Sequence, residues 1–205
     1  MARLSREEKR LITRKKMRYT ALKEFALHGF AGAAIERISE SAGFSRGAFY
    51  ANYQNKEDIL LDLLKENHQQ NMAEWQSYIN DSSSINDVYK KMAENLSDYL
   101  LDTDWGLFNI EVLLKAKRDD AFASQYLIYL EEAHKNIEKS LLAMFLKAHK
   151  QPPENIQIIT QIIHNLVIGL ILDTKSDQSP TSLNRSSEQF IFCIKNFIVA
   201  APPLK

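Results

Sequence analysis

Helical periodicity runs through almost all of this 205-residue chain and is the feature that most limits its fold. Apolar residues recur at spacings of three and four, and no segment alternates apolar and polar residues as a half-buried strand does. Glycine and proline are scarce, with 6 and 5 residues, and most of them stand between the periodic stretches. The pattern therefore predicts an all-α fold of about nine helices.

The first five helices have the clearest boundaries. Ser5 and Glu8 have the spacing of a capping box, so we expect the first helix to begin after Ser5, and Gly29 suits its left-handed end. Further helices are expected at 34–42, 45–53 and 56–79, where Asn55 is placed to cap the last of them. A polar loop at 80–84 precedes the helix expected at 85–102.

The second half of the chain is divided by weaker signals. Asp104 resembles an N-terminal cap, and Ser186 with Gln189 resembles a capping box. Pro152–Pro153 resembles a helix start, because proline suits the first helical turn. We expect helices at 105–117, 120–149, 153–173 and 186–200, with a polar loop at 173–182.

Charge is distributed unevenly although the whole chain is neutral. Residues 1–56 hold 12 Lys and Arg against 5 Asp and Glu, a net +7, and residues 57–205 hold 14 against 21, a net −7. Such a division is typical of a segment that binds a polyanion. The N-terminal segment lacks the apolar core of a signal peptide, and polar residues interrupt the most apolar stretch, 156–172. We therefore expect a cytoplasmic protein without a membrane span.

Two short helices around Gly43 describe a helix-turn-helix, whose second helix enters the major groove of DNA. Gly43 supplies the positive φ that the turn needs. We call the second helix the recognition helix; one of its faces points to the domain core and the other offers side chains to bases and phosphates. The candidate DNA-binding residues are Arg46, Gly47, Ala48, Tyr50, Ala51, Asn52 and, in the next helix, Lys56.

Three stretches of this basic segment match one known family: Ala21–Phe30, Ala42–Tyr50 and Asn55–Asp58. With them, residues 9 to about 64 resemble the N-terminal domain of the TetR family of bacterial transcriptional regulators. The resemblance implies that the recognition helix reads the major groove. It also implies that Tyr50 and Lys56 contact phosphates.

The sequence departs from the family pattern at three places. Ala33 and Ala34 stand where Thr or Ser usually caps the second helix, and loss of a cap costs ~1 kcal/mol. Ser39 replaces a small apolar residue that packs against the recognition helix. Tyr53 replaces Phe, which adds a hydroxyl that needs a partner.

The last two expected helices are apolar on almost all sides, so each must be buried on more than one face. The resemblance implies a homodimer joined by these helices, with operator half-sites ~34–36 Å apart and roughly palindromic. A helix buried wholly within one subunit is the alternative. The candidate interface residues are Ile159, Ile163, Val167, Phe190, Ile194 and Phe197.

The resemblance also implies a small apolar effector held among the middle helices, in an apolar pocket with a few polar anchors. Aromatic residues at helical spacing and a single histidine are equally typical of an ordinary core. The candidate effector-binding residues are Trp75, Tyr78, Tyr99, Phe108, Tyr126, Tyr129, His164 and Asn165.

The rest of the sequence shows no motif of a catalytic or metal-binding site. The five histidines form no HExxH motif and Cys193 is the only cysteine, so no enzyme activity, metal site or cofactor is expected. We expect a DNA-binding domain at 1–56, a linking helix at 56–79, and a regulatory and dimerisation domain at 80–205. The expected function is that of a ligand-responsive repressor. The alternatives are an activator, an architectural or chromosome-organising DNA-binding protein, and a helical ligand-binding protein that does not bind DNA.

Overall fold

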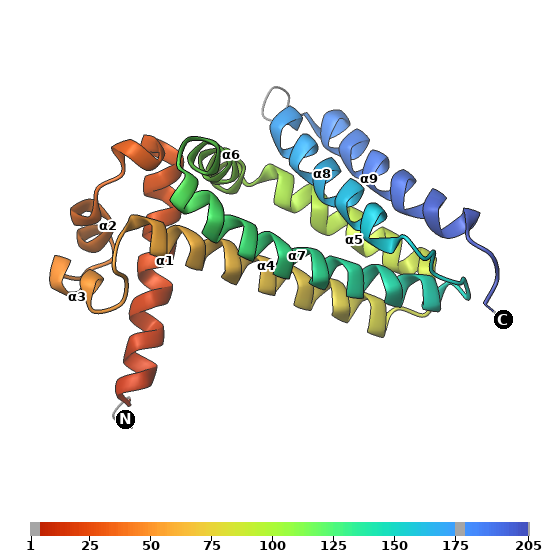
Figure 1. The fold of residues 1–205 in the computed structure, drawn as a ribbon, viewed down its shortest axis with the longest axis horizontal. Helices are drawn as coiled ribbons and strands as arrows, with labels where there is room; N and C mark the ends of the chain where they lie inside the picture. Colours follow the sequence, from red (N-terminus) through yellow and green to blue (C-terminus); the bar gives the residue numbers. More distant parts are fainter. Residues whose placement is uncertain (1–4, 175–178, 205) are drawn as a thin grey trace. The chain divides into compact units, whose positions relative to one another are not determined.

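The computed structural model describes residues 5–174 and 179–204, and nine helices make up most of this part of the chain (Figure 1). Apart from one isolated bridge between Lys150 and Pro203, no β-structure occurs among these residues. The all-α prediction is confirmed. The helices are α1 (Arg6–Gly32), α2 (Ile35–Ser41), α3 (Arg46–Tyr50), α4 (Lys56–Asp81), α5 (Ile85–Leu101), α6 (Thr103–Arg118), α7 (Asp120–Lys147), α8 (Ile156–Thr174) and α9 (Pro180–Ala200).

The expected caps of α1 and α4 are present. The Ser5 side chain accepts a hydrogen bond from the Glu8 N–H, and the Glu8 carboxylate accepts one from the Ser5 N–H. Asn55 Oδ1 accepts from the Asp58 N–H at 2.8 Å. Both were predicted from residue spacing alone, because a cap is made by side chains close in sequence.

Two cap predictions in the second half are wrong. Asp102, not Asp104, caps α6, because its Oδ1 accepts from the N–H groups of Asp104 and Trp105. Ser186 lies inside α9, which begins six residues earlier than expected. The part of the expected loop 173–182 at residues 175–178 lies outside the described residues.

The prolines at 152 and 153 do not begin α8, which starts at Ile156. They belong to an extended stretch that bonds to the C-terminal segment: the Gln151 N–H donates to the Pro202 carbonyl at 2.9 Å, and the Leu204 N–H donates to the His149 carbonyl at 2.9 Å. This pairing between distant residues is not visible in the local sequence.

Two compact units can be distinguished. Unit 1 comprises Met1–Asn67 and Leu107–Leu127, and unit 2 comprises His68–Gly106 and Ile128–Lys205. Helices α4 and α7 therefore contribute residues to both units. The domain boundaries expected at residues 56 and 80 were defined by function, and they do not coincide with the boundaries between the two units. They stay a prediction.

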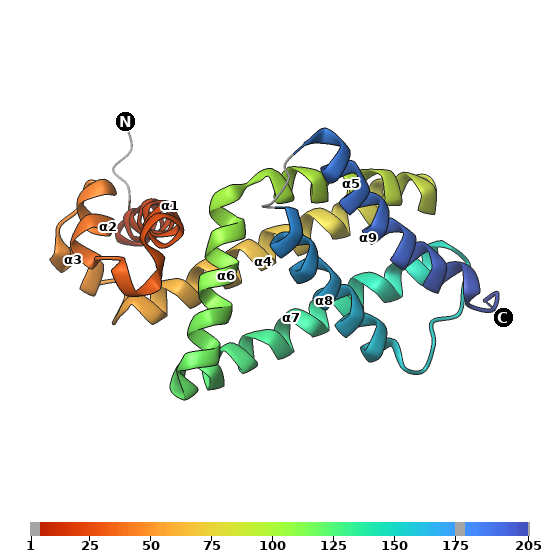
Figure 2. The ribbon, with the colours of Figure 1, turned by 90° about the horizontal axis from the view of Figure 1, so that it is seen from above.

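In unit 1, α2 packs against α1 and α3 packs against α2 (Figure 2). One fully buried side chain from each helix meets in the core: Phe25 of α1, Ile38 of α2 and Phe49 of α3. Phe108 of α6 joins them, with its ring 6.1 Å from that of Phe25. Burial of such aromatic side chains fixes the two short helices, which are too short to be stable alone.

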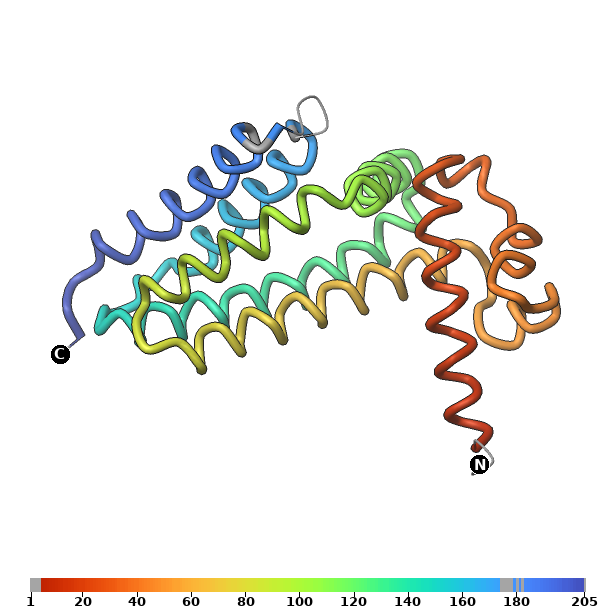
Figure 3. Tube along the Cα trace, turned by 180° about the vertical axis from the view of Figure 1, so that it is seen from behind, coloured from red at the N-terminus to blue at the C-terminus, as the bar shows by residue number. Residues whose placement is uncertain are grey.

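In unit 2, α5, α8 and α9 lie side by side (Figures 1 and 3). Met92 of α5, Ile163 of α8 and Phe190 of α9 are buried in their common core. The stretch Ile156–Asp173 of α8 is long and apolar enough to pass for a membrane span by composition. One such helix is weak evidence for a membrane span, and part of α8 packs against α5 and α9.

Helix α1 is interrupted at Gly29. This residue has φ +67° and ψ 171°, a conformation that residues with a side chain rarely adopt. A Cβ atom at this position would lie 3.1 Å from a carboxylate oxygen of Glu111 in α6. The same carboxylate accepts a hydrogen bond from the Phe30 N–H at 2.8 Å. The backbone angle therefore favours glycine here, and an added Cβ would also crowd the Glu111 carboxylate.

We expect the Gly29→Ala substitution to lower the free energy of unfolding by roughly 1–3 kcal/mol, the cost of holding an alanine in this backbone region. Urea unfolding followed by circular dichroism measures the loss. Gly32→Ala is the matched control, because Gly32 has no positive φ and its added Cβ would only approach the His28 Cβ at 3.5 Å. Equal losses in the two variants would contradict the assignment.

Candidate functional site

The turn between α2 and α3 has the geometry that the sequence predicted. Gly43 has φ +78°, and the Phe44 N–H donates to the Ser39 carbonyl at 2.9 Å. The Ser45 side chain then caps α3 by accepting from the Ala48 N–H at 3.3 Å. The short helix α3 is thus fixed at its first turn by its own cap and in its middle by buried Phe49.

The outer face of α3 is exposed and carries a linked pair of side chains. Arg46 donates to the Tyr50 hydroxyl at 3.3 Å, and its guanidinium lies 5.5 Å from the centre of the Tyr50 ring. The other side of Arg46 is paired with Glu36 of α2 at 2.7 Å. Tyr50 is 48% exposed. Together they present a positive charge and a hydroxyl on the face expected to meet DNA.

Three other candidates on this face have small side chains. Gly47 and Ala51 are exposed and Ala48 is half-buried. A Cβ added to Gly47 would meet only the Ser45 Oγ, at 3.7 Å, an ordinary contact. Nothing within the described residues requires glycine at this position, so its small size leaves room for an outside partner at the surface of α3.

Two candidates are engaged with the chain itself. The Asn52 side-chain NH₂ donates to the Ala48 carbonyl at 2.8 Å, and its Oδ1 is buried with no partner among the described residues. Lys56 Nζ donates to the carbonyls of Phe30 at 2.7 Å and Ala33 at 2.9 Å, and lies 3.4 Å from that of Ala31. The three hydrogens of the ammonium group are therefore used within unit 1.

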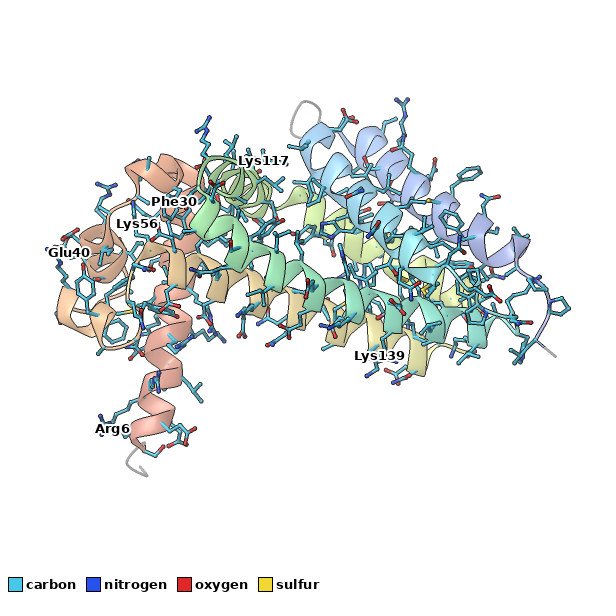
Figure 4. All side chains as sticks on the ribbon, in the orientation of Figure 1. Arg6, Phe30, Glu40, Lys56, Lys117 and Lys139 are labelled. Carbon is cyan, nitrogen blue, oxygen red and sulfur yellow. The ribbon has the colours of Figure 1, made fainter. Side chains whose placement is uncertain are left out.

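The ring of Phe30 adds to the environment of Lys56. Figure 4 shows Lys56 beside Phe30, and Nζ lies 4.7 Å from the ring centre. Lys115 of α6 lies over the same ring at 4.6 Å and pairs with Glu57 at 3.0 Å. Burial lowers the pKa of Lys56, although nearby Glu57 opposes the shift. A phosphate contact by Lys56 stays a prediction, while its structural role is directly visible.

The extra hydroxyl of Tyr53 has a partner in α4. It donates to Asp62 Oδ2 at 2.7 Å, and Asp62 also pairs with Arg14 at 2.6 Å and Arg18 at 3.0 Å. Burial acts to raise the pKa of Asp62, but hydrogen bonds from Tyr53 and Arg18 and the charge of Arg14 hold it below its usual value. The cluster joins α1 to α4 across the partly buried edge of unit 1.

Four of the six residues expected at a dimer interface lie in the core of unit 2: Ile159, Ile163, Phe190 and Ile194. Val167 and Phe197 are half-buried. The exposed large apolar side chains in the described part of α8 and α9 are Ile158, Ile162 and Leu172 on one helix and Phe192 and Val199 on the other, of which Phe192 is 71% exposed. Both helices are apolar on two faces, and the sequence did not show which face the chain buries itself.

The candidate effector residues divide between the two units. Phe108 and Tyr126 lie in unit 1, where Phe108 packs on Phe25 and Tyr126 stacks on Phe122 at 6.4 Å. The others lie in unit 2. There Trp75 packs on Phe190, Tyr78 and Tyr99 pack against the core, and Asn165 is exposed. Trp75 and the tyrosines at 78 and 99 therefore contribute to ordinary packing.

Tyr129 and His164 belong to a polar cluster within unit 2. The rings of His164 and His134 lie 4.9 Å apart, and the rings of His68 and Tyr129 lie 6.1 Å apart. His68 Nε2 also lies 3.3 Å from the Asn136 side-chain nitrogen. We call His68, His134 and His164 the histidine cluster. The sequence analysis missed His68, His134 and Asn136, because only the packing of α4, α7 and α8 brings them to His164.

The histidine cluster is uncharged near neutral pH. Burial, with the charges of His134 and His68, lowers the pKa of His164 to about 4. Burial also lowers the pKa of His68 and of His134. His134 Nε2 is buried and has no hydrogen-bond partner among the described residues. No group of three or more potential ligands suited to a metal ion occurs in the described part of the chain.

Comparisons with known proteins address the N-terminal domain first. The family model of the bacterial regulatory proteins of the tetR family matches residues 19–63, which span the end of α1, the turn and the start of α4. The chain carries a TetR-family helix-turn-helix domain. The repressor AcnR of Corynebacterium glutamicum is 24% identical over 147 residues, which cover 72% of this chain and 73% of AcnR.

Solved structures show that the likeness in fold extends beyond the TetR domain. FadR of Bacillus subtilis, in complex with stearoyl-CoA, has a TM-score of 0.69 at 16% identity and covers 89% of this chain and 98% of its own. The complex of SmeT with triclosan has a TM-score of 0.66 at 20% identity and covers 90% of each chain; SmeT represses an efflux pump of Stenotrophomonas maltophilia. At these identities the likeness shows a shared fold.

In the TetR domain of this chain, a side chain of α1 replaces the missing side-chain cap of α2. Ala34 makes no cap of its own, but its N–H donates to Glu24 Oε1 of α1 at 3.1 Å. The same carboxylate is paired with Arg37 of α2. Ser39 is fully buried and its hydroxyl donates to the Ile35 carbonyl at 2.7 Å. Each departure from the family pattern thus has a partner within unit 1.

We expect Lys56→Gln to lower the free energy of unfolding by about 2 kcal/mol, because it leaves the carbonyls of Phe30 and Ala33 without their charged donor. Thermal and urea unfolding measure the change. The matched control is Lys65→Gln, an exposed lysine of the same helix. A Lys56→Gln variant as stable as the wild type would contradict the structural role and leave phosphate contact as its only use.

Proposed function

We propose that this protein is a transcriptional repressor that binds a palindromic operator as a homodimer and is released by a small, largely apolar molecule. The observation that carries the proposal is the exposed Arg46–Tyr50 pair on a capped recognition helix within a strongly basic segment. Arginine pairs with guanine edges or phosphate, and a tyrosine hydroxyl donates to phosphate. The repressor function of AcnR supports the same reading.

The exposed apolar face of α8 and α9 supports the homodimer. Ile158, Ile162, Phe192 and Val199 form a set of large apolar side chains on two adjacent helices of unit 2. Exposed large apolar side chains on neighbouring helices are often covered in an interface between proteins. A second copy of the chain offers an identical apolar face, so one twofold axis is enough to cover both.

The histidine cluster supports a binding site for an effector in unit 2. Three uncharged imidazoles and the Asn136 amide offer both donors and acceptors beside Tyr129, next to an apolar core. An apolar pocket with a few polar anchors is the usual form of such a site. FadR was solved with stearoyl-CoA, which carries a long apolar acyl chain, and SmeT with triclosan, a largely apolar compound.

Release from DNA follows from a shift between two conformations. Helices α4 and α7 contribute to both units, so a change in unit 2 reaches the residues of unit 1 along continuous helices. The effector shifts the balance only by its difference in affinity for the two conformations, and a coupling of about 1–3 kcal/mol is ordinary. Such a regulator acts in the cytoplasm, where it meets DNA, and needs no catalytic group.

We expect footprinting on DNA from upstream of the protein's own gene to show a palindromic protected site at physiological salt. Tyr50→Phe keeps the ring on Phe49 but removes the hydroxyl, so we expect roughly 3- to 10-fold weaker binding. Tyr78→Phe, in unit 2, is the matched control and is expected to bind like the wild type. Absence of DNA binding by the folded wild type would refute the proposed function.

We expect the free energy of unfolding to fall as the pH is lowered from about 6.5 toward 4. The folded-state pKa of His164, about 4, lies below the unfolded value of 6.5, so the unfolded chain binds the proton first. Stability is complete above pH 6.5, and His164 alone removes roughly 2–3 kcal/mol by pH 4.5, at 1.36 kcal/mol for each unit. Urea unfolding at pH 7.5 and pH 4.5 measures the difference.

His164→Gln is expected to make this pH dependence shallower, because glutamine does not titrate. His28→Gln removes a histidine of α1 that is exposed on unit 1, and it serves as the control for loss of any histidine. A His164→Gln variant with the full pH dependence of the wild type would show that His164 is not held neutral.

A further inference from the structure

A second basic surface lies on α1, outside the helix-turn-helix. Ile12, Lys15, Lys16 and Tyr19 have the i, i+3, i+4, i+7 spacing of one helical stripe, and with Thr20 they line a groove of about 530 Å³ closed by Ser41 and Ala42 at the end of α2. Ile12 is 43% and Tyr19 60% exposed. We call this the α1 groove.

The lysines of the α1 groove have no acidic partner. On the opposite side of the same helix, Arg14 and Arg18 are paired with Asp62. None of the ion pairs among the described residues involves Lys15 or Lys16, and both side chains are exposed. Lys16 lies only against the Phe44 ring, 5.9 Å from its centre. Two positive charges without an acidic partner among the described residues therefore lie at one edge of the α1 groove.

The α1 groove adjoins the turn that leads into the recognition helix. Ser41 and Ala42 directly precede the Gly43 turn, and Phe44, which Lys16 touches, directly precedes the cap of α3. Beyond the groove, α1 extends toward its free end, where Figure 4 labels Arg6. Lys9 and Arg10 are exposed along this part of α1, so positively charged side chains continue from the groove toward the N-terminus.

We propose that the α1 groove binds the phosphate backbone of the DNA duplex whose major groove α3 enters. The inference rests on the proposed function, which supplies the duplex. A major groove is bounded by two phosphate backbones, so a surface that adjoins the recognition helix meets one of them. The lysines supply charge and the hydroxyls of Tyr19 and Ser41 supply donors, which is the chemistry of sequence-independent phosphate contacts.

Salt dependence distinguishes this role from a structural one. Each phosphate neutralised by a lysine releases counterions, so the slope of log K against log salt concentration reports how many contacts are made. A substitution that only disturbed folding would leave that slope unchanged. Lys15 and Lys16 are exposed, so their replacement by glutamine is expected to leave the melting temperature as it is.

The test is fluorescence anisotropy with a mixed-sequence duplex of about 30 base pairs, over about 0.05–0.3 M salt. For K15Q/K16Q we expect a slope shallower by about 1.8, or 0.9 for each lost contact, and binding at least ~10-fold weaker at 0.1 M salt. The control K135Q/K139Q removes two exposed lysines of α7 in unit 2, and so the same net charge. It is expected to keep the slope of the wild type.

An unchanged slope in K15Q/K16Q, with the wild type bound, would overturn this inference and leave the proposed function standing. An equal loss in both double variants would also overturn it, because net charge rather than the α1 groove would be responsible. Absence of binding by the wild type at every salt concentration would overturn the proposed function and this inference together.

Discussion

The arrangement of unit 1 depends on how the interrupted end of α1 is satisfied. At the break at Gly29, the Phe30 N–H and the carbonyls of Phe30 and Ala33 find their partners outside α1, and such groups are costly to bury unpaired. Lys56 of α4 donates to the carbonyls of Phe30 and Ala33, and Glu111 of α6 accepts a hydrogen bond from the Phe30 N–H. Two helices distant in sequence are thereby joined to the helix that supports α2 and α3.

Local signals predicted the helices well where caps and breaks lie close in sequence. Ser5 with Glu8, Asn55 with Asp58 and Gly43 all act within three or four residues, and each was readable from the chain. The errors fall where a distant segment decides the outcome. Gln151, which precedes the two prolines, bonds to Pro202 of the C-terminal segment, and no helix opens at Pro152–Pro153; Ser186 lies inside α9. A cap-like pattern carries no information about whether the preceding residues are already helical.

In the candidate site, too, local features could be predicted from the sequence and contacts between distant segments could not. The exposed positions of Arg46 and Tyr50 follow from helical periodicity and from buried Phe49. The carbonyl partners of Lys56 and the meeting of His68, His134 and His164 depend on packing between helices, which periodicity cannot give. The exposed face of α8 and α9 could not be predicted from the sequence for a further reason. A helix that is apolar all round does not reveal which of its sides the chain covers by itself.

The pairing of Arg46 with Glu36 bears on how such a protein searches a genome. An arginine held by a carboxylate of its own chain is not free to bind every phosphate that it passes. The carboxylate itself is repelled by the backbone of any duplex, whatever its sequence. Only a base edge that offers Arg46 two well-placed acceptors compensates for the lost pair. Under the proposed function, Glu36 would weaken contacts with bulk DNA more than contacts with the correct site, and so shorten the time spent on the many sequences that are not the target.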